Sequence, residues 1–371
     1  MAQPNGVYIT RPALPPLDEV IVHLERIWET HKLTNNGPMA QALEAQLCDS
    51  LGLTHLSLTS NCTLGLIATL RALDIRGEVI TTPFSFVATS NAIVMAGATP
   101  VFADIDPISL NLSPRTVAES ITECTSAIVA VHSYGHPCDI EGLQAIADEH
   151  GIPLIFDAAH CFGARLHDRS LLDFGTCSVV SFHATKVFNT FEGGAVITRD
   201  PEIKNTVDRL INHGIDDEFN TPDIGLNAKM SEFHAAIGLA QLPYVADDIA
   251  RRGALVARYL EALKEIQGLC PVRPMPEHLV PNNYMFPIVV DAAYPLSRDE
   301  LFERLKREGI FARMYFFPLI SDLPSFRDMP SAARDMLPVA VHTANRILCL
   351  PLFPDLETKA QDRIIDLLRA P

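Results

Sequence analysis

The chain has 371 residues, of which 48% are hydrophobic and 20% are charged, and these values exclude a disordered or low-complexity protein. Lys and Arg number 29 against 45 Asp and Glu, a formal net charge of −16, and the sequence has no basic run, so we expect no binding to nucleic acid. The length predicts a large domain and a second, smaller one.

Two helices are predicted first, at residues 17–31 and 39–50. Strands and helices then alternate, which is typical of a largely parallel sheet. Strands are predicted at 55–60, 78–82, 100–105, 126–132 and 153–158, and helices at 62–73, 85–96, 114–123 and 139–149. Two last strands, at 178–183 and 194–198, are joined by a loop too short for a crossover helix, so we predict that they pair antiparallel.

From about residue 228 the pattern changes to long helical segments, and a smaller unit begins after Gly268. This unit is predicted to contain strands at 285–290 and 311–316 and helices at 298–308, 338–347 and 358–368. We therefore predict a large domain with an N-terminal helical segment at residues 1–245, and a helical connector with a small C-terminal α/β domain at 246–371.

The eight cysteines are scattered, with no C-x-x-C pair, which predicts reduced thiols and a cytoplasmic protein. The apolar stretches are interrupted by Pro, Gly or charged residues before they reach membrane-spanning length. We therefore expect no membrane contact, and we expect no metal.

Polar residues follow several of the predicted strands, and an open α/β sheet binds its ligand at the carboxyl ends of its strands. The segment Ser60-Asn61-Cys62-Thr63 joins a strand to a helix, where backbone N–H groups and the Thr63 hydroxyl would bind a phosphate. The alternative is a simple helix cap. Asp157 ends the apolar run of PLIFDAAH, where a carboxylate needs a cationic partner unless it only caps a helix.

Lys186 follows an uncharged segment, SFHATK, that runs out of a predicted strand. A lysine desolvated in a pocket can form an imine, whereas the alternative is a surface lysine whose stem covers apolar groups. Phe86, in the segment PFSF, could cover the same site with its ring or pack in the core. A phosphate cradle, a flat aromatic ring, an acid and an imine-forming lysine are together the partners that pyridoxal phosphate needs.

These segments resemble those of the DegT–StrS family of sugar aminotransferases, which are pyridoxal-phosphate enzymes with the aspartate-aminotransferase fold. The resemblance covers nearly the whole chain and is most specific in SFHATKVFNTFEGGAVIT and GLNAKMSEFHAAIGL. It implies an α/β fold of type I, with a mostly parallel mixed sheet in the large domain and a smaller C-terminal α/β domain. Lys186 matches the lysine that binds the cofactor covalently, and Asp157 matches the acid that faces the pyridine nitrogen.

The resemblance also implies further cofactor contacts. The positions that match them are Cys62, Thr63, Phe86, His160, Ser181 and Asn227. Asn227 matches an asparagine that reaches the phosphate from the neighbouring subunit, which implies a homodimer with shared active sites. Cys62 stands where many relatives have glycine, but its N–H donor remains. His183, Tyr134, Arg313 and Tyr315 are weaker candidates for substrate contact, with core packing, a turn or a domain interface as alternatives.

The resemblance implies transfer of an amino group from glutamate to C4 of a nucleotide-linked 4-keto-6-deoxy sugar, with dTDP-4-keto-6-deoxyglucose as the expected acceptor. Alternative acceptors with the same cofactor are a 3-keto sugar, a keto-octulosonate and a cyclitol ketone. A non-catalytic, ligand-binding regulator on the same fold is the alternative of another class, and the presence of Lys186 favours catalysis over it. A nicotinamide oxidoreductase is disfavoured because the glycine pattern of such enzymes is missing.

Overall fold

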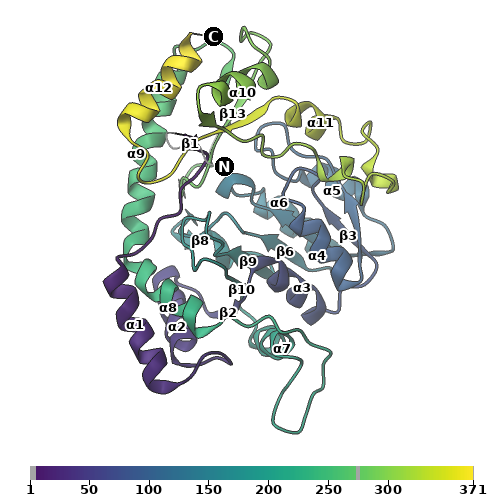
Figure 1. Ribbon diagram of the computed structural model, residues 1–371. Coiled ribbons are helices and arrows are strands. Elements are labelled where there is room, and N and C mark those ends of the chain that lie inside the picture. Colours follow the sequence, from purple (N-terminus) through teal and green to yellow (C-terminus); the bar gives the residue numbers. More distant parts are fainter. Residues whose placement is uncertain (1–5, 273–275, 371) are drawn as a thin grey trace.

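A computed structural model describes residues 6–272 and 276–370 of the chain (Figure 1). Its centre is a seven-stranded sheet in the order β2-β10-β9-β6-β5-β3-β4. The strands are β2 (His55–Thr59), β3 (Glu78–Thr81), β4 (Thr99–Phe102), β5 (Thr125–Val131), β6 (Leu154–Asp157), β9 (Cys177–Ser181) and β10 (Gly194–Thr198). Residues 1–5, 273–275 and 371 of the two predicted domains lie outside the described residues.

Only β10 runs against its neighbours in this sheet. It pairs antiparallel with both β2 and β9, whereas the other neighbouring pairs are parallel. The predicted antiparallel pairing of the segments 178–183 and 194–198 is therefore confirmed. The register places Gly194 opposite both Thr59 and Ser181. The carboxyl ends of β2, β9 and β6 consequently meet at one edge of the sheet.

Helices cover both faces of the sheet, which explains why its strands are almost continuously apolar. On one face lie α3 (Cys62–Ala72), α4 (Ala88–Ala96) and α7 (Pro201–Ile211). On the other lie α2 (Pro38–Leu51), α5 (Pro114–Ser120), α6 (Ile140–His150) and α8 (Glu232–Gln241). Successive residues of β5 alternate between the two cores: Ile128 packs with α5 and α6, and Val129 packs with α3 and α4.

The helices α1 (Leu17–Thr30), α2 and α8 form one group beside the sheet (Figure 1). Glu232 fixes the start of α2, because its buried carboxylate accepts hydrogen bonds from the backbone N–H groups of Met39 (2.7 Å) and Ala40 (3.0 Å). A negative charge at this point is favourable because the first N–H groups of a helix have no partner within it.

The helix α9 (Val245–Leu263) runs from this group to the C-terminal part of the chain (Figure 1). There an antiparallel sheet of β11 (Leu269–Pro271), β13 (Phe286–Val290) and β15 (Ile347–Leu350) shares a core with α9, α10 (Arg298–Arg307) and α12 (Thr358–Arg369). The remaining elements are short. They are β7 (Arg165–Leu166), β8 (Arg169–Ser170), β12 (Leu279–Val280) and α11 (Pro338–Ala344).

The N-terminal strand β1 (Val7–Tyr8) was not predicted, and it pairs in parallel with β14 (Ile310–Phe311) of the C-terminal part. Two predictions for the C-terminal part are wrong. The strand expected at 311–316 is only Ile310–Phe311, because the chain then turns, with the N–H of Phe317 donating to the carbonyl of Met314. The helix expected at 338–347 ends at Ala344, and the apolar run from Ile347 is the strand β15.

Among residues 6–272 and 276–370, no helix has the length and the apolar character needed to cross a membrane. The same part of the chain contains no group of three or more His, Cys, Asp or Glu side chains arranged to hold a metal ion.

Candidate active site

A cavity of about 370 Å³ opens at the edge of the main sheet where β2, β6 and β9 end. It brings together most of the residues singled out in the sequence. They are Cys62, Thr63, Phe86, Asp157, His160, Ser181, His183, Lys186 and Tyr315. Tyr284 and Phe316, from the C-terminal part of the chain, complete one wall. The cavity therefore lies between the segments predicted as the large and the small domain.

The start of α3 forms one side of this cavity. Asn61 caps the helix, because its Oδ1 atom accepts the N–H of Leu64 at 2.9 Å. The next N–H groups of a first helical turn, here those of Cys62 and Thr63, have no acceptor within the helix and suit an anion. Gly194 lets β10 pass close to this turn, since a Cβ atom at Gly194 would lie 2.7 Å from the Cys62 nitrogen.

The thiol of Cys62 is not activated as a nucleophile. Burial and the nearby Asp157 charge raise the pKa of the Cys62 thiol well above its ordinary value, although Lys186 opposes this shift. The thiol therefore stays protonated at neutral pH, and a neutral thiol is a poor nucleophile. The contribution of Cys62 to the cavity is its backbone N–H.

Asp157 is a buried carboxylate held by neutral donors. The Thr89 hydroxyl donates to its Oδ2 atom at 2.7 Å, and the Ala159 N–H donates to Oδ1 at 3.1 Å. Burial raises the pKa of Asp157, while these two hydrogen bonds and the Lys186 charge work in the other direction. No Lys, Arg or His of the described residues forms an ion pair with it. A cation bound in the cavity next to Asp157 would form the ion pair that this buried carboxylate lacks.

His160 presents a flat, neutral ring to the cavity. Its Nδ1 atom accepts the N–H of Tyr134 at 3.1 Å, which places the ring proton on Nε2. Burial, together with the positive charges of Lys186 and His136, lowers the pKa of His160 well below its ordinary value. The ring lies parallel to that of Phe316, with centroids 6.3 Å apart.

Lys186 lies in the loop after β9, where its backbone N–H donates to the His183 carbonyl. Its Nζ atom donates to the Tyr284 hydroxyl at 3.2 Å and lies 4.8 Å from the centroid of that ring. No carboxylate among the described residues forms an ion pair with this amine. Lys186 thus lines the cavity with the Tyr284 hydroxyl as the hydrogen-bond partner of its amine.

Ser181, His183 and Phe86 also line the cavity. The Ser181 hydroxyl accepts the N–H of His183, and the His183 ring contacts the Thr185 hydroxyl at 2.9 Å and Glu192 at 3.7 Å. Phe86, which is 62% exposed, brings an aromatic ring to the cavity lining. Such a ring is suited to stacking on a flat ligand.

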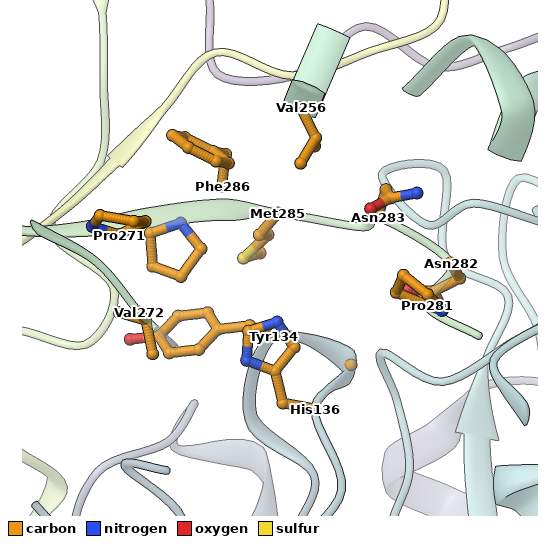
Figure 2. Close-up of a pocket in the computed structure, with 12 residues that line it drawn as sticks. Tyr134, His136, Val256, Pro271, Val272, Pro281, Asn282, Asn283, Met285 and Phe286 are labelled. Carbon is orange, nitrogen blue, oxygen red and sulfur yellow. The ribbon is translucent and has the colours of Figure 1, made fainter. Parts of the chain in front are cut away.

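Tyr134 does not line this cavity. It is buried, and its hydroxyl donates to the Tyr315 carbonyl. Its ring borders a separate cavity of about 20 Å³, where Figure 2 shows it beside Val272 and His136. A cavity of this size holds about one water molecule. Tyr134 therefore holds His160 with its backbone N–H and Tyr315 with its hydroxyl, from outside the active-site cavity.

Asn227 and Arg313 also lie outside the 370 Å³ cavity. The Asn227 side chain accepts a hydrogen bond from Lys229 Nζ at 2.8 Å, and its backbone pairs with Asn212. Arg313 lines a neighbouring cavity of about 170 Å³.

Sequence reasoning missed Thr89, Tyr284 and Phe316. Thr89 lies one position into the observed helix α4, and a threonine there carries no motif. Tyr284 immediately precedes the strand predicted at 285–290, and Phe316 was assigned to a strand. Of these three residues, only Tyr284 could have been proposed as a site residue from the sequence, because it is an aromatic residue with a hydroxyl beside a predicted strand.

Comparison with known proteins gives consistent matches over almost the entire chain. Residues 18–369 match the DegT/DnrJ/EryC1/StrS aminotransferase family. The dTDP-4-amino-4,6-dideoxy-D-glucose transaminase of Shigella dysenteriae is 46% identical over 365 residues, covering 98% of each chain. The protein of the same name from Escherichia coli is 43% identical over 363 residues, covering 97% of each chain. The crystal structure of DesI in the presence of its TDP-sugar product matches with a TM-score of 0.93 and 37% identity, over 99% of this chain and 93% of that one.

Proposed function

Since the chain belongs to the DegT/DnrJ/EryC1/StrS aminotransferase family and is a transaminase, we propose that it uses pyridoxal phosphate to move an amino group from glutamate to C4 of a nucleotide-linked 4-keto-6-deoxy sugar. The names of the two relatives support dTDP-4-keto-6-deoxyglucose as the acceptor. The observation that carries the proposal is that Lys186, Asp157 and the start of α3 line one cavity.

The residues of the cavity fit this cofactor. The Asp157 carboxylate is buried and has only neutral hydrogen-bond donors, so a protonated ring nitrogen would supply its missing cation. The N–H groups of Cys62 and Thr63, with the Thr63 and Ser181 hydroxyls, offer donors for a phosphate. Phe86 and His160 offer flat faces, and Lys186 offers the amine.

Bound pyridoxal phosphate would supply an aldehyde that captures amines and a ring that withdraws electrons. The protein's part is to place charges and protons. Asp157 would keep the ring nitrogen of the bound cofactor protonated, because a positive charge there would stabilise its desolvated carboxylate. Lys186 Nζ takes a proton from the carbon that carries the donor's amino group, and later returns a proton to C4 of the acceptor sugar. Tyr284 holds this amine in place between the two transfers.

We further propose a homodimer in which Asn227 of each subunit serves the active site of its partner. Asn227 lies outside the cavity of its own chain. It follows a loop after α7 that projects from the body of the protein (Figure 1), and this loop carries Phe219 and Ile224 at 92% and 89% exposure. Exposed apolar side chains on a projecting loop favour burial against another chain. Residues 1–245 and 246–371 would then be the large and small domains that enclose the site.

The proposed function is tested by incubating the purified protein with pyridoxal phosphate, glutamate and a panel of ketones, followed by mass analysis of the products. We expect dTDP-4-keto-6-deoxyglucose to gain an amino group, with 2-oxoglutarate as the second product. Amination of a 3-keto sugar, a keto-octulosonate or a cyclitol ketone in its place would reassign the acceptor. Failure to aminate any of them would disprove the proposed function.

A further inference from the structure

The 170 Å³ cavity adjoins the active-site cavity, and Thr185, Tyr284, Met285 and Tyr315 line both. Beyond these shared residues it is lined by Arg313 and by Ile9 and Thr10 of the N-terminal segment, with Leu350 and Leu352 as apolar walls. The Arg313 backbone is fixed, because it exchanges two hydrogen bonds with Cys349 of β15, at 3.2 and 2.7 Å.

Among the described residues that line these two cavities, Arg313 is the cation that remains available for a ligand. The other positively charged candidates in their linings are Lys186, which performs the chemistry, and His183, which contacts Thr185 and Glu192. The guanidinium of Arg313 forms no ion pair with any described residue. The second cavity has no carboxylate in its lining, whereas Asp157 and Glu192 line the first. In a chain of net charge −16, this cavity is a local site of positive charge.

Thr10 lines the same cavity as Arg313 and carries a second unused donor. Its Oγ1 atom is buried and has no hydrogen-bond partner in the structure. A buried hydroxyl without a partner loses free energy that a bound acceptor would restore. A guanidinium, an unpartnered hydroxyl and apolar walls together suit a carboxylate at the end of a short aliphatic chain.

We propose that the second cavity binds the distal carboxylate of the amino donor, with Arg313 as its counter-charge and the Thr10 hydroxyl as a further donor. This inference rests on the proposed function and assigns the residues that select glutamate. The carbon that reacts must lie at Lys186, and the α-carboxylate is bonded directly to that carbon. Arg313 lies beyond the residues shared by both cavities, so it suits the carboxylate that is separated from the reacting carbon by two methylene groups.

The test compares L-glutamate with L-glutamine, which has the same length but a neutral end. The half-reaction of each amino acid with the pyridoxal-phosphate enzyme is followed by absorbance, for the wild type and for Arg313→Gln, Arg313→Lys and Thr10→Val. Arg327→Gln is the matched control, because Arg327 is an exposed arginine outside both cavities. Binding of glutarate, an unreactive dicarboxylate, to the same proteins is measured by calorimetry, as a readout independent of activity.

We expect Arg313→Gln to lower the efficiency with L-glutamate and the affinity for glutarate about 10- to 100-fold, the effect of losing one charge-assisted interaction. The efficiency of Arg313→Gln with L-glutamine should change less than threefold. Arg313→Lys should keep part of the efficiency with L-glutamate that Arg313→Gln loses. Thr10→Val should lower the efficiency with L-glutamate and the affinity for glutarate by a smaller factor. The reverse half-reaction with a dTDP-linked 4-amino sugar should stay within about twofold of the wild type.

Three results would overturn the inference. If Arg313→Gln changes neither the efficiency with L-glutamate nor the affinity for glutarate, Arg313 binds neither of them. If Arg313→Gln lowers the efficiency with L-glutamate and with L-glutamine equally, Arg313 binds the α-carboxylate, which both amino acids share. If it slows the amino-sugar half-reaction as strongly, Arg313 binds the sugar nucleotide. A wild type that reacts with no amino sugar contradicts the proposed function alone, because glutarate binding still decides the role of Arg313.

Discussion

The Nζ atom of Lys186 donates a hydrogen bond to the hydroxyl of Tyr284, 3.2 Å away, although 98 residues separate the two in the sequence. The backbone of Tyr284 is itself held by two hydrogen bonds. Its N–H donates to Asn282 Oδ1 at 3.2 Å, and its carbonyl accepts a hydrogen bond from the buried Arg252 guanidinium at 3.3 Å. The C-terminal part of the chain therefore contacts the amine of Lys186, which lies in the loop after β9.

Replacing Tyr284 by Phe removes this hydrogen bond and keeps the ring. We expect the single-turnover rate to fall about 3- to 10-fold, the value of one neutral hydrogen bond, with little change in the affinity for the cofactor. Tyr294→Phe is the matched control, since its buried hydroxyl donates to the Leu368 carbonyl far from the cavity lining. That variant should lower the melting temperature without changing the rate. Equal rates for Tyr284→Phe and the wild type would contradict the positioning role.

Replacing Asp157 by Asn keeps the shape of the side chain and removes its charge. We expect the protein still to bind pyridoxal phosphate, as seen by its absorbance, while turnover falls by orders of magnitude because the ring nitrogen loses its counter-charge. Asp104→Asn is the control, because Asp104 is also buried and accepts the N–H groups of Val339 and Ala340, both at 2.8 Å. It should lose stability and keep its turnover. Near-normal turnover of Asp157→Asn would show that this carboxylate has only a structural role, through its hydrogen bonds to Thr89 and Ala159.

Adding one methyl group at Gly194 should disturb the phosphate cradle. A Cβ atom at this position would lie 2.7 Å from the Cys62 nitrogen and 2.8 Å from the Val180 carbonyl oxygen, which are both backbone atoms. We expect Gly194→Ala to weaken cofactor binding at least tenfold and to lower the melting temperature. Gly253→Ala in α9 is the comparison, because its nearest new contact is the side chain of Asn283 at 3.2 Å. Unchanged cofactor affinity in Gly194→Ala would show that the turn at Cys62 does not bind the phosphate.

Lys186 should carry the cofactor as a covalent imine, so the purified protein should be yellow and lose its colour on treatment with borohydride. Peptide mapping should then find the reduced pyridoxyl group on Lys186. Lys229 is an informative alternative, because burial lowers the pKa of its amine and Asn227 is its hydrogen-bond partner. A label on Lys229 or on any other lysine would refute the assignment of Lys186.

Shared active sites predict complementation between two inactive variants. In a mixed dimer of Lys186→Ala and Asn227→Ala, one site collects both defects and the other is intact, because a two-fold interface is used twice. Random exchange makes half of the dimers mixed, so roughly a quarter of the wild-type activity should return. Both parents must first be shown to be dimeric and nearly inactive. If subunits exchange and the activity stays at the average of the parents, Asn227 does not serve the partner's site.

The sequence by itself determined which segments form the strands of the main sheet and which residues lie at the ends of those strands. The runs that end at Asp157 and Ser181 are strands because they are apolar and bounded by turn-forming residues. Parallel strands place their carboxyl ends at one edge, so the proximity of the first helical turn at Cys62, Asp157 and Lys186 followed from local patterns.

Only the tertiary structure decided which side chains meet these residues. Thr89 binds Asp157 and Tyr284 binds Lys186 because separate segments pack around one cavity, and no local period records such a contact. The two-residue strand β1 is too short to show an alternating pattern, and it exists because Val7 pairs with Ile310. Thr10 and Arg313, which follow these paired strands, line the second cavity together, so this cavity lies between the N-terminal segment and the C-terminal part of the chain.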